Sequence, residues 1–144
     1  MKRTEVLAVV VGGALGAGAR EALMLAVADL PGGFPLPIFI ANMTAALVIG
    51  LVAGYAAART ISRGWVKLLL MTGLCGGLST FSSFIWGTEQ MLGDPTQRVT
   101  ATVYLVGSMV MGLLLVWLGY RAGERIAWGR PPTDGGSPAD HGTR

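Results

Sequence analysis

The chain has 144 residues, of which 52% are apolar and only 13% charged, with a net charge of +3 and a mean hydropathy of +0.58. This composition excludes an ordinary soluble domain, in which about a quarter of the residues are charged, and predicts an integral membrane protein. Since each helix that crosses a bilayer needs about 20 apolar residues, little of the chain is left for a catalytic domain outside the membrane.

Four charge-poor stretches, taken in chain order, predict an all-α membrane protein with four transmembrane helices. They cover residues 5–28, 35–58, 66–91 and 98–121, each approximately. Together they form one transmembrane domain over residues 1–125. The remaining residues, 126–144, are rich in proline, glycine and charge, so they cannot support a packed core and are expected to form a disordered tail.

The first stretch also has features of a secretory signal, because Lys2 and Arg3 precede an apolar run that reaches the small residues Ala17-Gly18-Ala19. The apolar character resumes after Arg20 and Glu21, however, and continues to residue 28. We therefore predict a full transmembrane helix that is interrupted at this charged pair, rather than a cleaved leader.

Small residues recur four positions apart, a spacing that lets transmembrane helices approach closely. The pairs are Gly12 with Gly16, Gly13 with Ala17, Ala46 with Gly50, Gly50 with Gly54, Gly73 with Gly77, and Ser108 with Gly112. Most of them are expected to be packing positions. Because four short helices make a thin bundle whose polar residues can hardly line a pore alone, we also expect an oligomer.

Residue types that usually perform catalysis are scarce in this chain. The only cysteine, Cys75, lies inside the third stretch, and the only histidine, His141, lies in the tail without a cluster of metal-ligating residues nearby. The sequence contains no phosphate-binding loop with its lysine and no paired carboxylates within the stretches. An enzyme is therefore not expected.

The third stretch contains the run Gly-Leu-Cys-Gly-Gly-Leu-Ser-Thr-Phe-Ser-Ser-Phe at residues 73–84. It is too apolar to leave the membrane, yet its glycines and hydroxyls weaken a helix. A weakened helix survives at this depth only where it contacts protein, water or an ion. A break between Gly76 and Ser79 would free backbone carbonyls to coordinate a hard cation such as sodium, although a flexible kink explains the glycines equally well.

Neutral polar and aromatic residues in three of the stretches suit a small anion. Phe81 and Phe84 share one helix face, and Tyr104 and Ser108 point the same way because they are four residues apart. Asn42 either forms a hydrogen bond between helices or donates its amide N–H to an anion. Hydroxyl groups and the partly positive edges of aromatic rings attract an anion without trapping it.

The run at residues 73–84 closely resembles the signature Gly-x-x-Gly-Gly-x-Ser/Thr-Thr-Phe-Ser-Thr/Ser-Phe of the Fluc (CrcB) fluoride channel family. The glycine-rich segment 13–20, which ends in Arg20, and the combination of Asn42 with Gly50 are also similar to that family. The resemblance covers the chain up to about residue 125. It implies a fluoride-specific channel in the cell membrane that passively exports cytoplasmic fluoride, relieves its toxicity and works as an antiparallel dimer.

The resemblance also implies roles for individual residues. A structural sodium ion, which is not transported, would bind the backbone carbonyls of Gly76 and Ser79 at the dimer centre. Arg20 would attract anions near a pore vestibule. The fluoride pathway would be lined by Asn42, Phe81, Ser82, Ser83, Phe84, Tyr104 and Ser108.

Three positions depart from the family pattern. Pro37-Ile38-Phe39 replaces a Gly-Thr-Leu-like turn before the asparagine. Gly87 replaces a common glutamate, for which Glu89 is the nearest acid, and Gly112 removes a hydroxyl one turn after Ser108. The polar track is therefore expected to be thinner than the family pattern suggests.

Basic residues are unevenly distributed between the two ends of the predicted helices. Arg20 and Arg98 fall towards one end, whereas the other end carries Lys2, Arg3, Arg59, Arg63, Lys67, Arg121, Arg125 and Arg130. The positive-inside rule then predicts both termini in the cytoplasm. An antiparallel homodimer needs the chain to insert both ways, so pairing with a homologous subunit of opposite topology is a hypothesis beside pairing with itself.

Two other functions remain open. A small four-span multidrug exporter also forms antiparallel dimers but needs a carboxylate within the membrane, and the only acid in the first stretch, Glu21, lies beside Arg20. A non-transporting assembly subunit would use Asn42, Ser83 and Ser108 for packing bonds only, so alanine there would change stability without changing any flux.

Overall fold

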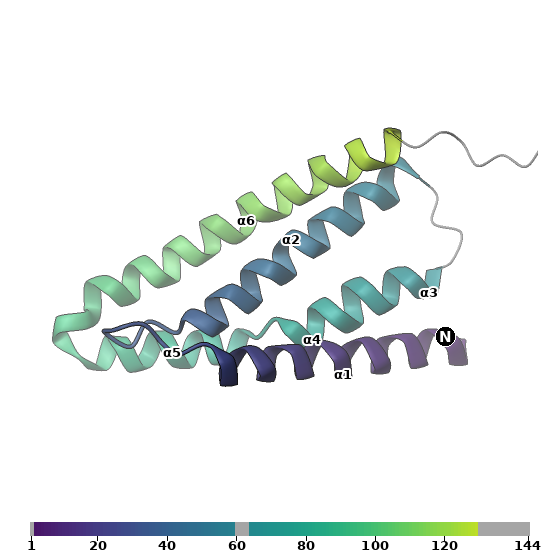
Figure 1. Cartoon of the computed structure of the whole chain (residues 1–144). Coiled ribbons are helices and arrows are strands. Elements are labelled where there is room, and N and C mark those ends of the chain that lie inside the picture. Colours follow the sequence, from purple (N-terminus) through teal and green to yellow (C-terminus); the bar gives the residue numbers. More distant parts are fainter. Residues whose placement is uncertain (1, 60–63, 130–144) are drawn as a thin grey trace, which may run out of the picture.

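A computed structural model describes residues 2–59 and 64–129 of the chain. Within them, four helical segments are long and apolar enough to cross a membrane. Figure 1 shows how the helices are arranged. They are α1 (Arg3–Ala26), α2 (Leu36–Ala58), an interrupted third segment over Gly64–Gly93, and a last segment dominated by α6 (Arg98–Trp128). The predicted all-α architecture with four spans is confirmed.

Two helices differ from their predicted extent. α1 is continuous through Arg20 and Glu21, so the predicted interruption there is wrong. Glu21 is exposed and the Arg20 side chain reaches a backbone carbonyl of the third segment, so neither charge has to be buried unpaired. α6 continues past the predicted end at 121 to Trp128, which makes the beginning of the expected tail helical. Residues 130–144, the rest of that tail, lie outside the described residues.

The third segment is interrupted near its middle, as predicted. It consists of α3 (Gly64–Lys67), the π-helical η1 (Leu68–Cys75), the single turn α4 (Gly76–Leu78) and α5 (Phe81–Gly93). Between α4 and α5 the backbone is extended, with ψ of 152° at Ser79 and φ and ψ of −148° and 120° at Thr80. The break thus lies at the end of the range expected from the sequence.

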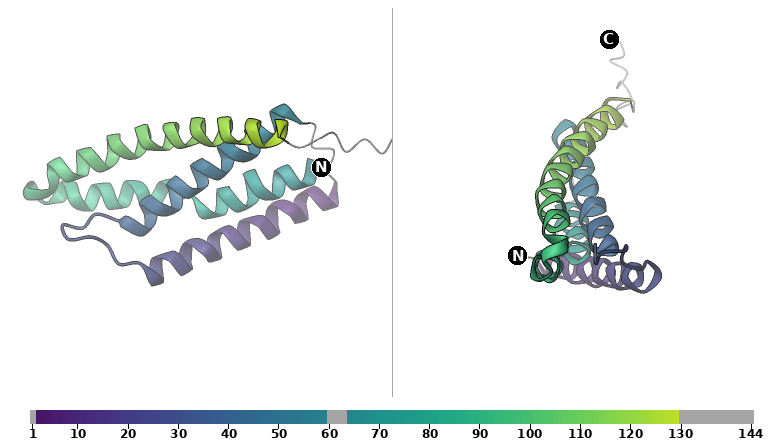
Figure 2. Two further views of the ribbon diagram at one scale, coloured as in Figure 1. Left: turned by 45° about the horizontal axis from the view of Figure 1, so that its top comes forward. Right: turned by 90° about the vertical axis from the view of Figure 1, so that its left-hand side faces the viewer.

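Glycines allow α2 and α6 to pack with their backbones in contact, and the two helices lie side by side in Figures 1 and 2. At each of four glycines an added Cβ would overlap a backbone carbonyl oxygen of the opposite helix: Gly50, Gly54, Gly119 and Gly123. Packing at Gly50 and Gly54 was predicted. The reciprocal pair on α6 was missed, although its members are also four residues apart.

A second close contact joins α1 to the third segment. A Cβ added at Gly12, Gly16 or Gly77 would overlap a backbone oxygen across this contact, and one added at Gly73 would lie 2.9 Å from the Cα of Gly12. These predicted packing positions are confirmed. Gly112 differs, because its nearest neighbour is the terminal methyl of Met43 at 3.7 Å.

The buried apolar core is small and lies where α2 begins and α5 and α6 meet. Its members are Ile38, Phe84, Met91, Ala101 and Tyr104. Many large apolar side chains of the long helices remain exposed, as a membrane-spanning bundle requires.

The turn before α6 is capped outside the spans by Asp94, which precedes the short helix η2 (Pro95–Gln97). The Asp94 carboxylate accepts hydrogen bonds from the hydroxyl and the backbone N–H of Thr96, at 2.7 and 2.9 Å. These bonds hold the pKa of Asp94 below its ordinary value of 3.8. Because the folded state favours the charged form, this stabilisation is present above that value and is lost as the pH falls below it.

Candidate functional site

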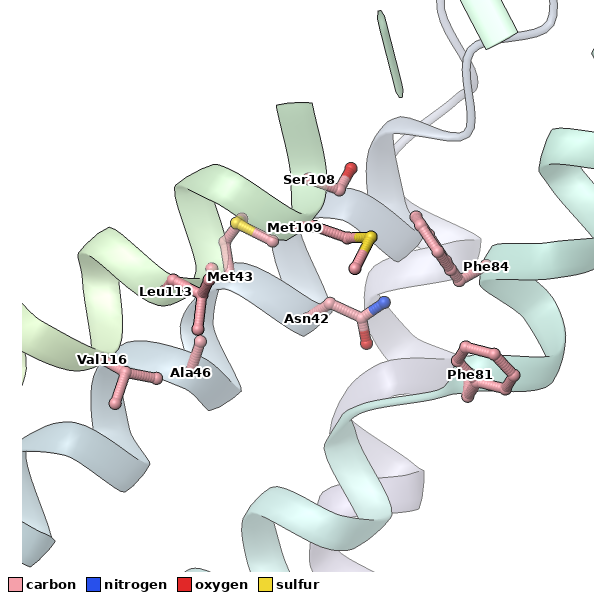
Figure 3. Close-up of a pocket in the computed structure, with 10 residues that line it drawn as sticks. Asn42, Met43, Ala46, Phe81, Phe84, Ser108, Met109, Leu113 and Val116 are labelled. Carbon is pink, nitrogen blue, oxygen red and sulfur yellow. The ribbon is translucent and has the colours of Figure 1, made fainter. Parts of the chain in front are cut away.

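A pocket of about 400 Å³ lies between α2, α5 and α6, and Figure 3 shows its lining side chains. Four residues predicted for an anion pathway are brought together here: Asn42, Phe81, Phe84 and Ser108. The other lining residues are apolar, with methionines and aliphatic side chains from α2 and α6, and none of them is charged. The pocket therefore offers neutral polar groups and aromatic rings, but no fixed positive charge.

Asn42 bridges α2 to the break in the third segment. Its Oδ1 accepts a hydrogen bond from the Thr80 backbone N–H at 2.8 Å, and its Nδ2 donates one to the Thr80 carbonyl at 3.2 Å. The amide thus satisfies both backbone groups of an extended residue, as a neighbouring strand would. An amide nitrogen carries two N–H groups, so one remains for a ligand in the pocket.

Thr80 caps the first turn of α5. Its hydroxyl oxygen accepts from the Ser83 backbone N–H at 3.2 Å and lies 3.1 Å from the Ser83 hydroxyl and 3.3 Å from that of Ser82. The two serines predicted for the pathway thus form part of a helix cap, outside the pocket lining. Thr80 was not among the predicted site residues, although a threonine directly before a helical run is a known signal for an N-cap.

Two buried hydroxyls near the pocket have no partner within the described residues, those of Tyr104 and Ser108. Ser108 is 8% exposed and lines the pocket, whereas Tyr104 is 1% exposed and lies behind Phe84, with 5.1 Å between the ring centroids. An unsatisfied buried hydroxyl costs about 1–3 kcal/mol. Such a group marks a place where a ligand or water completes the hydrogen bonding.

The two pathway phenylalanines differ strongly in burial. Phe84 is 8% exposed and belongs to the core, whereas Phe81 is 77% exposed, with its ring centroid 6.3 Å from that of Phe84. Phe81 therefore forms one wall of the pocket that is not covered by the chain itself.

The break removes the helical donors of the carbonyls of residues 76–79, and two of those donors are bound elsewhere. In an unbroken α-helix the N–H groups of residues 80 and 83 would bond the carbonyls of Gly76 and Ser79. Here the first N–H donates to Asn42 and the second to the Thr80 hydroxyl. Gly77 differs, because its carbonyl accepts from Arg20 Nη1 at 3.2 Å.

These two carbonyls fit the chemistry of a hard cation, which binds neutral backbone oxygens. The position of Gly76 is exposed, and a Cβ added there would meet nothing within 4 Å, so the space beside it is open. Sodium binding at Gly76 and Ser79 and the vestibule role of Arg20 stay predictions.

Two of the departures from the family pattern have a structural counterpart. Gly87 is buried, and a Cβ added there would lie 2.9 Å from Cγ of Pro35, so a glutamate would displace the proline-rich start of α2. Gly112 lines the pocket and has room for a larger side chain. Gly87 is therefore a packing position against Pro35. Gly112 leaves the pocket without the hydroxyl that the family pattern has at this place.

The sequence is similar to known proteins over most of its length. The sequence profile of the family described as "CrcB-like protein, Camphor Resistance (CrcB)" matches residues 7–120. A Yersinia pseudotuberculosis protein named fluoride-specific ion channel FluC 3 is 42% identical over 120 residues, which are 83% of this chain and 89% of that protein. A Methylobacillus flagellatus protein named fluoride-specific ion channel FluC is 41% identical over 81% of this chain and 91% of its own length.

A third relative is longer. The Brucella melitensis protein named fluoride-specific ion channel FluC 2 is 39% identical over 85% of this chain, but over only 45% of its own length. All three relatives are named as ion channels and none as an enzyme. With a family profile that spans its four helical segments and relatives of this similarity, the chain belongs to the CrcB-like family of membrane channel proteins.

Proposed function

We propose that the chain is a subunit of a fluoride-specific channel in the cell membrane, through which cytoplasmic fluoride leaves passively and its toxicity is relieved. The observation that carries this function is the uncharged pocket in which the unpartnered Ser108 hydroxyl lies with Asn42, Phe81 and Phe84. The names of the relatives support fluoride as the anion.

The pocket chemistry suits rapid passage of a small anion. The free N–H of Asn42 and the Ser108 hydroxyl replace part of the water shell of the ion, and the ring edges of Phe81 and Phe84 add partial positive charge. Because no full positive charge lines the pocket, the ion is bound weakly enough to leave. No chemical step is involved.

A second subunit completes the proposed channel. One chain supplies the carbonyls of Gly76 and Ser79 to the proposed site, whereas hard cations such as Ca²⁺ take about six to eight oxygen ligands. An antiparallel partner would double the set at the dimer centre and cover the exposed wall formed by Phe81. Bound there, a structural sodium ion, which is not transported, would hold the two breaks together and add positive charge near the anion path.

The charge distribution predicts the orientation of the subunit. Figure 1 places the N-terminus, α3 and the end of α6 at one end of the bundle. The segments that begin or end there carry the predicted basic residues Lys2, Arg3, Arg59, Lys67, Arg121 and Arg125. Two further predicted members of this group, Arg63 and Arg130, lie outside the described residues. By the positive-inside rule we expect this end in the cytoplasm. The antiparallel partner is then a homologous subunit of opposite bias, or a second copy that inserts the other way.

The proposed function is tested by fluoride efflux from liposomes that contain the purified chain alone, measured with a fluoride electrode and compared with chloride efflux. We expect rapid efflux that is selective for fluoride. If well-folded protein gives no efflux, the measurement is repeated after co-expression with a homologous subunit. No efflux from that pair, or equal efflux of chloride, would contradict the proposal.

We expect Ser108→Ala to slow fluoride efflux several-fold while leaving the protein at least as stable as the wild type. Removing a buried hydroxyl that has no protein partner costs no hydrogen bond in the folded state and removes an unsatisfied group. Efflux and thermal unfolding in detergent are measured on the same preparation. A non-transporting assembly subunit predicts the opposite pattern, in which stability changes and no flux exists to change.

A further inference from the structure

We infer that Asn42 and Thr80 are positioning residues that keep the carbonyls of Gly76 and Ser79 free for a cation, by capturing the backbone donors that would otherwise occupy them. This inference rests on the proposed sodium site. It assigns to two side chains a role that the ion pathway alone does not require.

The first capture is made by Asn42. The Thr80 N–H is the natural donor to the Gly76 carbonyl in a continuous helix, and Asn42 Oδ1 holds it instead at 2.8 Å, a good hydrogen-bond distance. The Nδ2 group then binds the Thr80 carbonyl at 3.2 Å, so the residue is held from both sides in its extended conformation. Without this amide, nothing of the same geometry competes with the helical bond.

The second capture is made by Thr80 itself. Its hydroxyl oxygen accepts from the Ser83 N–H at 3.2 Å, and that N–H is the natural helical donor to the Ser79 carbonyl. Thr80 therefore helps to free both carbonyls. Its own N–H no longer donates to Gly76, and its hydroxyl holds the N–H that would otherwise donate to Ser79.

Arg20 occupies a further carbonyl at the break. The carbonyl of Gly77 lies between the other two in the sequence and also loses the regular helix beyond it, but it accepts the guanidinium N–H of Arg20 at 3.2 Å. The Gly77 carbonyl is therefore already hydrogen-bonded to a cationic side chain. Among the carbonyls at the break, those of Gly76 and Ser79 are the two whose helical donors are held by Asn42 and Thr80. Asn42 also lines the anion pocket, so one side chain serves both ions.

The inference is tested by the thermal stability of the purified protein in detergent as sodium replaces N-methyl-D-glucamine at constant ionic strength. Asn42→Leu and Thr80→Val remove the capturing acceptors, whereas Asn42→Asp and Thr80→Ser keep an acceptor oxygen in each place. We expect the sodium concentration for half-maximal stabilisation to rise at least tenfold in the first pair and to stay within about threefold of the wild type, or fall, in the second.

Several outcomes would overturn the inference. The inference is wrong if Asn42→Leu and Thr80→Val keep the wild-type sodium midpoint. It is also wrong if Asn42→Asp or Thr80→Ser is no longer stabilised by sodium. The second pair of variants stays informative even if the first pair does not fold. A wild-type protein that conducts fluoride but gains no stability from sodium would refute the inference and leave fluoride conduction standing.

A separate observation concerns the outer face of α2 and α6 near the basic end of the bundle. A pocket of about 590 Å³ lies there, with Trp117, Arg121 and Arg125 beside apolar Leu47, Leu118 and Ile126. The Arg121 guanidinium carbon lies 5.8 Å from the centroid of the Trp117 ring. Both arginines are exposed, and neither guanidinium forms an ion pair within residues 2–59 and 64–129.

The position of this pocket matches the membrane surface. With 31 residues at about 1.5 Å each, α6 is about 46 Å long and exceeds the hydrocarbon core of about 30 Å. Its last turns therefore reach the headgroups, where tryptophan side chains also gather. We propose that this pocket binds an anionic phospholipid, whose phosphate contacts Arg121 and Arg125 while an acyl chain lies on the leucines.

The lipid site is tested by adding phosphatidylglycerol, phosphatidylcholine or inorganic phosphate to the detergent-purified full chain and measuring thermal stability. We expect stabilisation by phosphatidylglycerol alone, and its loss in the double variant Arg121→Gln/Arg125→Gln. Arg98→Gln, which removes an exposed arginine at the other end of α6, is the matched control and keeps the effect. Equal stabilisation by phosphatidylcholine or by inorganic phosphate would overturn the site, as would an unchanged response in the double variant.

Discussion

Replacing Gly54 with alanine is expected to destabilise the bundle by about 3 kcal/mol or more, the upper end of the range for overpacked cores. The added Cβ would overlap the Tyr120 carbonyl oxygen and lie 2.7 Å from its carbon and 2.9 Å from its Cα. These are backbone atoms of α6, so no side chain can turn away. Only separation of α2 from α6 relieves the overlap, and thermal unfolding in detergent followed by tryptophan fluorescence measures the loss.

The matched control is the same substitution where the glycine has free space. A Cβ added at Gly107, which is also on a long helix, would meet nothing within 4 Å. Alanine is the better helix former by about 1 kcal/mol, so Gly107→Ala is expected to leave stability unchanged or raise it. If Gly54→Ala unfolds at the wild-type temperature, the close α2–α6 contact is not what holds the bundle together.

The second large effect concerns flux rather than stability. We expect Phe81→Ile to reduce fluoride efflux at least a hundredfold, because it removes an aromatic ring that lines the pocket and replaces it with an aliphatic group. The side chain is 77% exposed within the chain and packs little, so the free energy of unfolding is expected to change by less than about 0.5 kcal/mol. Efflux and thermal unfolding on one preparation separate the two effects.

Trp65→Ile is the control for loss of an aromatic ring. Trp65 is 41% exposed and lies on α3, at the basic end of the bundle and outside the pocket. Its efflux is expected to match the wild type. Wild-type efflux in Phe81→Ile would mean that this ring is no part of the anion pathway, and a matching loss in both variants would point to a general effect of aromatic truncation.

Local patterns in the sequence were sufficient to predict the architecture. The apolar content and the length of the charge-poor stretches determine four spans, because only a helix satisfies every backbone group inside a bilayer. Glycines four residues apart identified the close contacts at Gly50 and Gly54 and at Gly73 and Gly77. The cluster of glycines and hydroxyls at residues 76–84 located the break to within a residue or two.

Contacts between segments decided that α1 is continuous and how the side chains pack. The charged pair of Arg20 and Glu21 inside an apolar run predicted an interruption in α1. The helix is continuous, because the Arg20 guanidinium donates a hydrogen bond to the Gly77 carbonyl on another helix. The absence of a glutamate at position 87 could not be interpreted from the sequence either. It follows from Pro35, whose ring fills the space that a larger side chain would need.

The division is clearest at the break itself. The sequence alone determined that polar groups would gather there and which residue types they are, since propensity and spacing act over one or two turns. The sequence left two roles open for Asn42 and assigned no role to Thr80, because the hydrogen bonds between these residues join positions that are 38 residues apart in the chain. Which donor meets which acceptor is decided only when α2 lies against the third segment, and that choice determines which carbonyls of the break stay free.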